Sequence, residues 1–116
     1  MKAVAVVALA LVAVSSAAAA RSHTRIAVRP GTVSPGAAIH VTGNAAPCRL
    51  GNHVYAISKA FPGHQFGIGA LTGLVRAGGA FTITGHVRRT IRAGRYGVTA
   101  RCGGGNLGVV AYFRIR

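Results

Sequence analysis

After residue 23, most of the chain consists of short runs in which apolar and polar residues alternate, and turn residues separate the runs. Alternation with a period of two places the apolar side chains on one face of an extended strand. Helix signals are nearly absent from the same region, whereas glycine and β-branched residues are frequent. The pattern predicts strands over residues 24–29, 38–43, 53–61, 65–76, 80–89, 95–102 and 107–116.

The alternation also indicates which side of each strand faces a core. Either face of 53–61 fits an interior, and 65–76 gives the weakest signal because glycines interrupt it. Six or seven short strands at regular spacing are typical of an all-β fold, an antiparallel two-sheet sandwich of the immunoglobulin-like kind. The predicted inward residues of the last three strands are Phe81, Ile83, Val87, Tyr96, Val98, Ala100, Cys102, Leu107, Val109, Ala111, Phe113 and Ile115.

The start of the chain, over 1–20, follows a different pattern. A positive start, Met1-Lys2, precedes an apolar run over 3–14 and a tail of small residues that ends at Ala20. This is the layout of a secretory signal peptide. An uncleaved membrane anchor is the alternative, but a bilayer span needs about 20 apolar residues. We expect cleavage after Ala20, which removes 1–20 and leaves one domain, 21–116, that is secreted or associated with the cell wall.

The chain has two cysteines, Cys48 and Cys102, which lie far apart in the sequence. An even count in a small exported domain predicts one disulfide. A redox or metal-binding pair is the alternative, and the lack of a second thiol close in sequence to either cysteine disfavours it. We therefore expect a structural bridge.

Cys102 is followed by three consecutive glycines in the stretch "RCGGGNLG". Such a stretch either cradles a phosphate or turns the chain. A phosphate-binding loop needs Gly-Lys-Ser or Gly-Lys-Thr at the start of a helix, and neither is present. Glycine and asparagine tolerate the positive φ of hairpin turns. We therefore predict a turn of about four residues, 103–106.

The charge balance is the most unusual feature of the composition. There are 14 lysines and arginines and no aspartate or glutamate, so the formal net charge is +14. Either an anionic partner selects this surface, or the reading frame does not encode a genuine protein. The leader, the cysteine pair and the strand pattern argue against the second explanation.

The absence of acids excludes several kinds of chemistry. Paired-carboxylate acid–base catalysis, a Ser-His-Asp triad and a carboxylate site for Ca²⁺ or Mg²⁺ all need side chains that the sequence lacks. Ser58 and Thr72 have no acid or neighbouring histidine that would activate them. We expect a protein that is not an enzyme and that has no cofactor.

Several segments together resemble small secreted immunoglobulin-like domains of actinobacteria, which are largely uncharacterised. In that family, an opening run of this kind forms the first two strands, the "GRYGVTARC" run is strand F, and the paired cysteines bridge the two regions. The resemblance implies a fold and no catalytic residues. A more distant resemblance is to the apoproteins of chromophore-carrying antibiotics, from which this chain departs in its single cysteine pair and basic charge. The segments are "VRPGTVSPGAAIHVTG" (28–43), "APC" (46–48), "GAFTITGHV" (79–87) and "AGRYGVTARCGGGNLG" (93–108).

The predicted outward residues of the last two strands form one basic patch if these strands pair. Arginine binds phosphate and carboxylate groups bidentately and stays protonated. In an immunoglobulin-like strand order, the third strand lies beside the pair and adds a lysine. The alternative is that these arginines belong to an ordinary solvated surface without a ligand. Other arginines, among them Arg88, Arg89 and Arg92, are predicted to lie elsewhere, so the positive charge is not confined to this face. The predicted anion-binding residues are Arg95, Arg101, Tyr112, Arg114, Arg116 and Lys59, with Thr99 between them.

The five histidines show no metal-ligand spacing, so we expect no metal site formed by them. One exception depends on the cleavage site. Cleavage after Ala20 would expose Arg21-Ser22-His23, and a free amine, two amide nitrogens and an imidazole at position three can enclose Cu²⁺ or Ni²⁺.

These observations together predict a secreted, non-catalytic binding or structural module. Its expected partner is an anionic polymer of the cell envelope, either a wall phosphate polymer or an acidic polysaccharide. Nucleic acid bound without sequence specificity and a membrane surface stay open as partners. Two other functions stay open as well: a cationic, membrane-active antimicrobial effector, and a carrier of a small ligand. Self-repulsion of the arginine-rich surface predicts a monomer.

Overall fold

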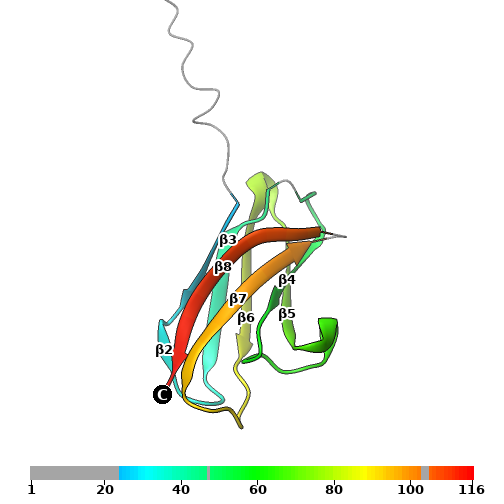
Figure 1. Cartoon of the computed structure of the whole chain (residues 1–116). Coiled ribbons are helices and arrows are strands. Elements are labelled where there is room, and N and C mark those ends of the chain that lie inside the picture. The colour runs from blue at the N-terminus through cyan, green and yellow to red at the C-terminus, as the bar shows by residue number, and fades with distance from the viewer. Residues whose placement is uncertain (1–23, 47, 103–104) are drawn as a thin grey trace, which may run out of the picture.

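The computed structural model describes residues 24–46, 48–102 and 105–116, and it is an all-β structure of two sheets (Figure 1). A three-stranded sheet has the order β1-β3-β6, and a five-stranded sheet has the order β2-β8-β7-β4-β5. Two short 3₁₀ turns, η1 (Gln65–Gly67) and η2 (Ala77–Gly79), are the only helical elements of the described residues. The strands are β1 (Arg25–Arg29), β2 (Thr32–Val33), β3 (Ala38–Asn44), β4 (His53–Ile57), β5 (Ala70–Leu74), β6 (Ala80–His86), β7 (Gly94–Cys102) and β8 (Gly105–Ile115).

One apolar core lies between the two sheets, and it follows the alternation of the sequence. The three-stranded sheet contributes Ile39 and Val41 from β3, and the five-stranded sheet contributes residues such as Val98 and Phe113. The predicted inward residues of 80–89 are all buried, and those of the last two strands are buried or packed against the core except Ala111, which is half-buried. Burial of each large apolar side chain stabilises the fold by about 1.5–3 kcal/mol. Within the described residues, no helix has the length and apolar character that crossing a membrane requires.

The two central ranges of the prediction were too long. The predicted strand 53–61 ends at Ile57, because Ser58 turns the chain. The Ser58 carbonyl accepts a hydrogen bond from the Phe61 N–H at 3.1 Å, and its hydroxyl accepts one from the Ala60 N–H at 3.1 Å. The predicted strand 65–76 shortens to β5, since η1 occupies its first part. Phe66, inside η1, has a φ of 58°.

A short strand, β2, was missed, and it also corrects the prediction of a purely antiparallel fold. The turn at Pro30-Gly31 lets the chain leave the three-stranded sheet, where β1 pairs with β3, and join the other sheet. There β2 runs parallel to the end of β8, with Val33 beside Ile115. A strand of this length is too short to show a period, so the sequence pattern gave no signal for it.

The predicted disulfide between Cys48 and Cys102 is present, with the two Cα atoms 6.2 Å apart. It joins the connection between β3 and β4 to the end of β7. Cys102 pairs with Gly105, so β8 begins earlier than the predicted start at residue 107. Two of the four residues of the predicted turn 103–106, Gly105 and Asn106, belong to β8, and the other two lie outside the described residues. The predicted signal peptide 1–20 and the Arg21-Ser22-His23 set also lie outside them.

Candidate anion-binding surface

The strand register places part of the predicted basic patch on the outer face of the five-stranded sheet. Arg95 of β7 lies directly opposite Arg114 of β8, and residues opposite each other in an antiparallel pair share a face. Tyr112 lies opposite Gly97, one step further along the same face. The Arg95 guanidinium carbon lies 3.9 Å from the centre of the Tyr112 ring. This stacking holds the Arg95 guanidinium over the sheet.

Arg101 lies at the other end of β7. Its distance from Arg95 along an extended strand is roughly 20 Å. Its guanidinium carbon is 4.8 Å from the centre of the Phe66 ring, which in turn meets the Tyr55 ring edge-on with centroids 5.2 Å apart. Arg101 is half-buried, in contrast to the exposed Arg95. The two arginines of β7 therefore belong to different parts of the face.

The remaining two predicted residues, Arg116 and Lys59, follow the two strands that flank β7 in the sheet. Arg116 follows β8, and its backbone N–H donates to the Val33 carbonyl at 2.9 Å, so it belongs to the β2 edge. Lys59 follows β4, on the other side of β7. The structure therefore brings Arg95, Arg114 and Tyr112 together, with Arg116 two residues beyond Arg114, and leaves Arg101 apart from them.

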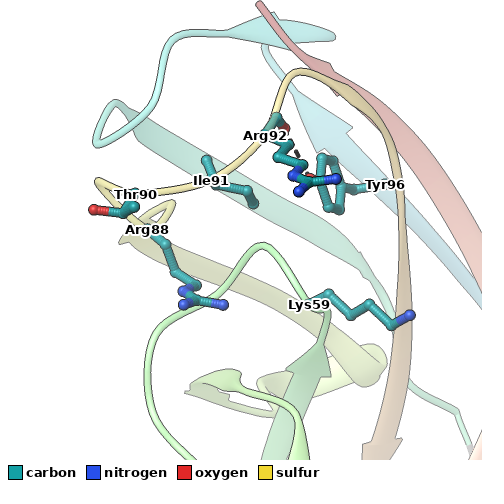
Figure 2. A pocket seen from close by; sticks show the side chains of 6 residues that line it. All are labelled: Lys59, Arg88, Thr90, Ile91, Arg92 and Tyr96. Atoms are coloured by element: carbon teal, nitrogen blue, oxygen red, sulfur yellow. Dashed lines mark hydrogen bonds between the residues drawn. The ribbon is translucent and has the colours of Figure 1, made fainter.

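Lys59 shares a pocket with arginines that were predicted to lie elsewhere. It lines a pocket of about 410 Å³ with Arg88 and Arg92, which come from the connection between β6 and β7 (Figure 2). Thr90, Ile91 and Tyr96 complete the lining. We call this space the end pocket, because it lies where β7 begins, opposite the disulfide-bonded end of that strand. The convergence was not predictable from the sequence, since Lys59 and Arg88 belong to distant segments of the chain.

Hydrogen bonds fix the backbone of this connection. The Arg88 N–H donates to the Ala60 carbonyl at 2.8 Å, and the Tyr96 hydroxyl donates to the Arg92 carbonyl at 2.8 Å. Figure 2 draws the second of these bonds and shows the Arg92 guanidinium beside the Tyr96 ring. Ile91 packs against the core. The backbone is thus held in place while the Arg88 and Arg92 side chains stay exposed.

The end pocket borders two further depressions with which it shares lining residues. A hollow of about 600 Å³ on the outer face of the five-stranded sheet shares Lys59, Arg92 and Tyr96 with it. We call this the outer hollow. A depression of about 480 Å³ beside His64 and Arg89 shares Arg88 and Thr90 with the end pocket. We call the three spaces together the basic groove. The cations that line it are Lys59, Arg88, Arg89, Arg92 and Arg95.

The histidines are separate from one another, and two of them make local contacts. His40 Nδ1 lies 3.1 Å from Thr84 Oγ1, and His53 Nδ1 lies 3.4 Å from Thr72 Oγ1. The second contact corrects the expectation that Thr72 has no histidine neighbour, because pairing of β4 with β5 joins residues that are separated in sequence. The contact is long for a hydrogen bond. No group of three histidines or cysteines that could hold a metal ion occurs among residues 24–46, 48–102 and 105–116.

Comparisons with known proteins give a likeness of fold. No protein-family model matches the chain, and no curated protein is similar to it in sequence. Among solved structures, the chain is similar to an alkylpurine DNA glycosylase, AlkC, of Pseudomonas fluorescens, solved with DNA that contains an abasic-site analogue. The TM-score is 0.51 at 23% identity, over 82% of this chain and 31% of the glycosylase chain. The chain thus spans about a third of that enzyme's length, and the likeness concerns the fold alone.

Proposed function

We propose that the protein is an exported, non-catalytic binding module and that the basic groove takes an anionic polymer of the cell envelope. The observation that supports this most directly is the clustering of cations around three adjoining depressions. Five cations from three segments line spaces that share residues, and the chain has no acid to compete for them. A cluster of cations suits a polymer better than a single small anion, because successive phosphate or carboxylate groups can each meet a cation.

The proposed fold is an immunoglobulin-like sandwich, over 21–116, that follows a cleaved signal peptide over 1–20. The sheet composition supports it: β1, β3 and β6 correspond to strands A, B and E, while β4, β7 and β8 correspond to C, F and G. The small secreted domains of actinobacteria that the sequence resembles have this fold. The disulfide is compatible with an oxidising compartment outside the cytoplasm.

The test is retention of the purified, oxidised protein on cell-wall preparations with and without their phosphate polymers, at stepped salt concentrations. We expect retention that needs the polymers and falls as salt rises, because bound cations displace counterions from the polymer. An Arg92→Gln/Arg95→Gln double variant removes two cations of the groove. Its matched control is Arg25→Gln/Arg29→Gln, which removes the same charge from β1 of the other sheet.

We expect the groove variant to lose at least roughly tenfold in affinity, which is a larger loss than that of the control. Equal losses in the two variants would mean that net charge, and not the groove, binds the polymer. Retention that is independent of the wall polymers would contradict the envelope target. A parallel titration with single-stranded DNA tests nucleic acid as the partner, and one with vesicles of anionic lipid tests the membrane-active alternative. If the protein binds either one more tightly than the wall polymer, that ligand and not the wall polymer is the target.

A further inference from the structure

The outer hollow differs from the rest of the basic groove, because large apolar side chains form its floor. Ile68 is 45% exposed, Val110 49% and Tyr112 52%, and all three line this one space. Ile57, half-buried at the end of β4, adds to the same floor. An apolar floor with a few charged groups beside it is typical of small-ligand sites.

Gly97 lies close against the Tyr112 ring and the Val110 side chain. A Cβ atom built on Gly97 would lie 3.3 Å from Tyr112 Cε1 and 3.6 Å from Val110 Cγ2, so a side chain here would enter the space between them. Gly97 is not among the glycines with a left-handed φ, so the backbone does not require glycine at this place. Any larger residue would partly fill the hollow.

Cations stand around this apolar floor. Lys59 and Arg92 line the side shared with the end pocket, and Arg95 lines the hollow beside Tyr112. The stacking of Arg95 on Tyr112 holds its guanidinium in place, so less side-chain entropy is lost when it binds an oxyanion. The outer hollow thus has both an apolar floor and a cationic rim. Its volume of about 600 Å³ lies in the range of small-ligand sites.

We infer that the outer hollow binds an amphiphilic anion: a molecule with an apolar body and one oxyanion headgroup, such as a phosphate monoester. The body covers Ile68, Val110 and the Tyr112 ring, and the headgroup contacts Arg95 with Lys59 or Arg92. An inorganic anion leaves the apolar floor wet, and a neutral amphiphile leaves the cations without a partner. This site shares Lys59, Arg92 and Arg95 with the proposed polymer-binding groove, so the inference rests on the proposed function and the two ligands should compete for these cations.

The test is calorimetric titration of the oxidised protein with decyl phosphate below its micellar concentration. Two compounds serve as controls: methyl phosphate has the anionic headgroup without the long apolar chain, and decyl maltoside has the apolar chain without a charge. We expect decyl phosphate to bind at least roughly tenfold more tightly than either one, because only it uses both parts of the site. Similar affinities for decyl phosphate and methyl phosphate would overturn the inference. Binding only to vesicles of anionic lipid, and not to free decyl phosphate, would also overturn it.

Two variants locate the site without a change of charge. Gly97→Val fills the hollow, and Val110→Ser removes part of its floor at a side chain that is half exposed. Each should weaken decyl phosphate binding at least roughly tenfold and lower retention on wall polymers by a smaller factor, because the cations of the groove are unchanged. Thermal unfolding checks that the variants are folded, and Val110→Ser serves alone if Gly97→Val is not. Unchanged decyl phosphate affinity in a folded variant would place the ligand elsewhere.

Discussion

The outer faces of the two sheets both carry arginines and differ in their apolar surface. The exposed residues of the three-stranded sheet are small or polar apart from its two arginines, and His40 pairs with Thr84 across β3 and β6. They include Arg25, Ala27, Arg29, Ala38, His40, Thr82, Thr84 and His86. Nothing on this face offers a large apolar contact.

The five-stranded sheet and the connections of its strands hold every large apolar side chain that is exposed among the described residues. Leu74, Val110 and Tyr112 lie on its strands, Phe66 and Ile68 on the connection between β4 and β5, and Leu50 on the connection before β4. Arginines occur on both faces, so charge alone does not distinguish a binding surface from a solvated one. Apolar surface beside the cations makes that distinction.

The largest expected loss of unfolding free energy comes from the buried side of β8, compared with its exposed side. Phe113 is 2% exposed, with its ring near those of Phe61 and Tyr96, whereas Tyr112 is 52% exposed on the outer face. We expect Phe113→Ala to lower the free energy of unfolding by about 3–5 kcal/mol, because it leaves a cavity in the core. Tyr112→Ala should cost about 1 kcal/mol, mainly its contact with Arg95. Urea unfolding measures both, and comparable losses would mean that the faces are misassigned.

The disulfide should stabilise the fold without taking part in binding. It closes a loop with a sequence separation of 54, so we expect Cys48→Ser/Cys102→Ser to lower the free energy of unfolding by about 2–4 kcal/mol. The bridge lies at the far end of β7 from the end pocket, and the folded variant should keep its retention on anionic polymers. Reduction of the unmodified protein is the control and should have the same effect on urea unfolding. A variant that stays folded but loses retention would assign the bridge to the binding surface.

The smallest expected effect concerns the backbone bond that holds the connection between β6 and β7. Tyr96→Phe removes the hydroxyl that donates to the Arg92 carbonyl and should lower the free energy of unfolding by about 1 kcal/mol. Polymer affinity should fall roughly twofold, since Arg92 is then held less firmly. Tyr112→Phe is the matched control on the outer face and should change the unfolding free energy less. If both variants behave alike in urea unfolding and in retention, the bond does not position Arg92.

Much of the fold could be predicted because its determinants are local. Alternation over 80–89 and over the last two strands identified the buried side of each, and the cysteine count identified the bridge. The prediction failed where local pattern carries no information. β2 is too short for a period to appear, and the parallel partner of Val33, Ile115, lies near the opposite end of the chain.

The candidate site was predicted only in part, for the same physical reason. Arg95, Arg114 and Tyr112 were found because adjacent strands with matching alternation place them on one face. Arg92 and Arg88 were assigned elsewhere, and Phe66 and Ile68 were overlooked within a segment interrupted by glycines.

By itself, the sequence determined the strand pattern, the buried faces, the bridge and a surface of cations without acids. Each of these depends on residue type or on spacing within a few residues. Only the tertiary structure decided that Lys59, Arg88 and Arg92 line one pocket, and that Arg95 stacks on Tyr112 beside the outer hollow. The first arrangement depends on how the connection between β6 and β7 packs against the turn after β4, and the second depends on how β7 pairs with β8. Neither follows from local alternation of apolar and polar residues.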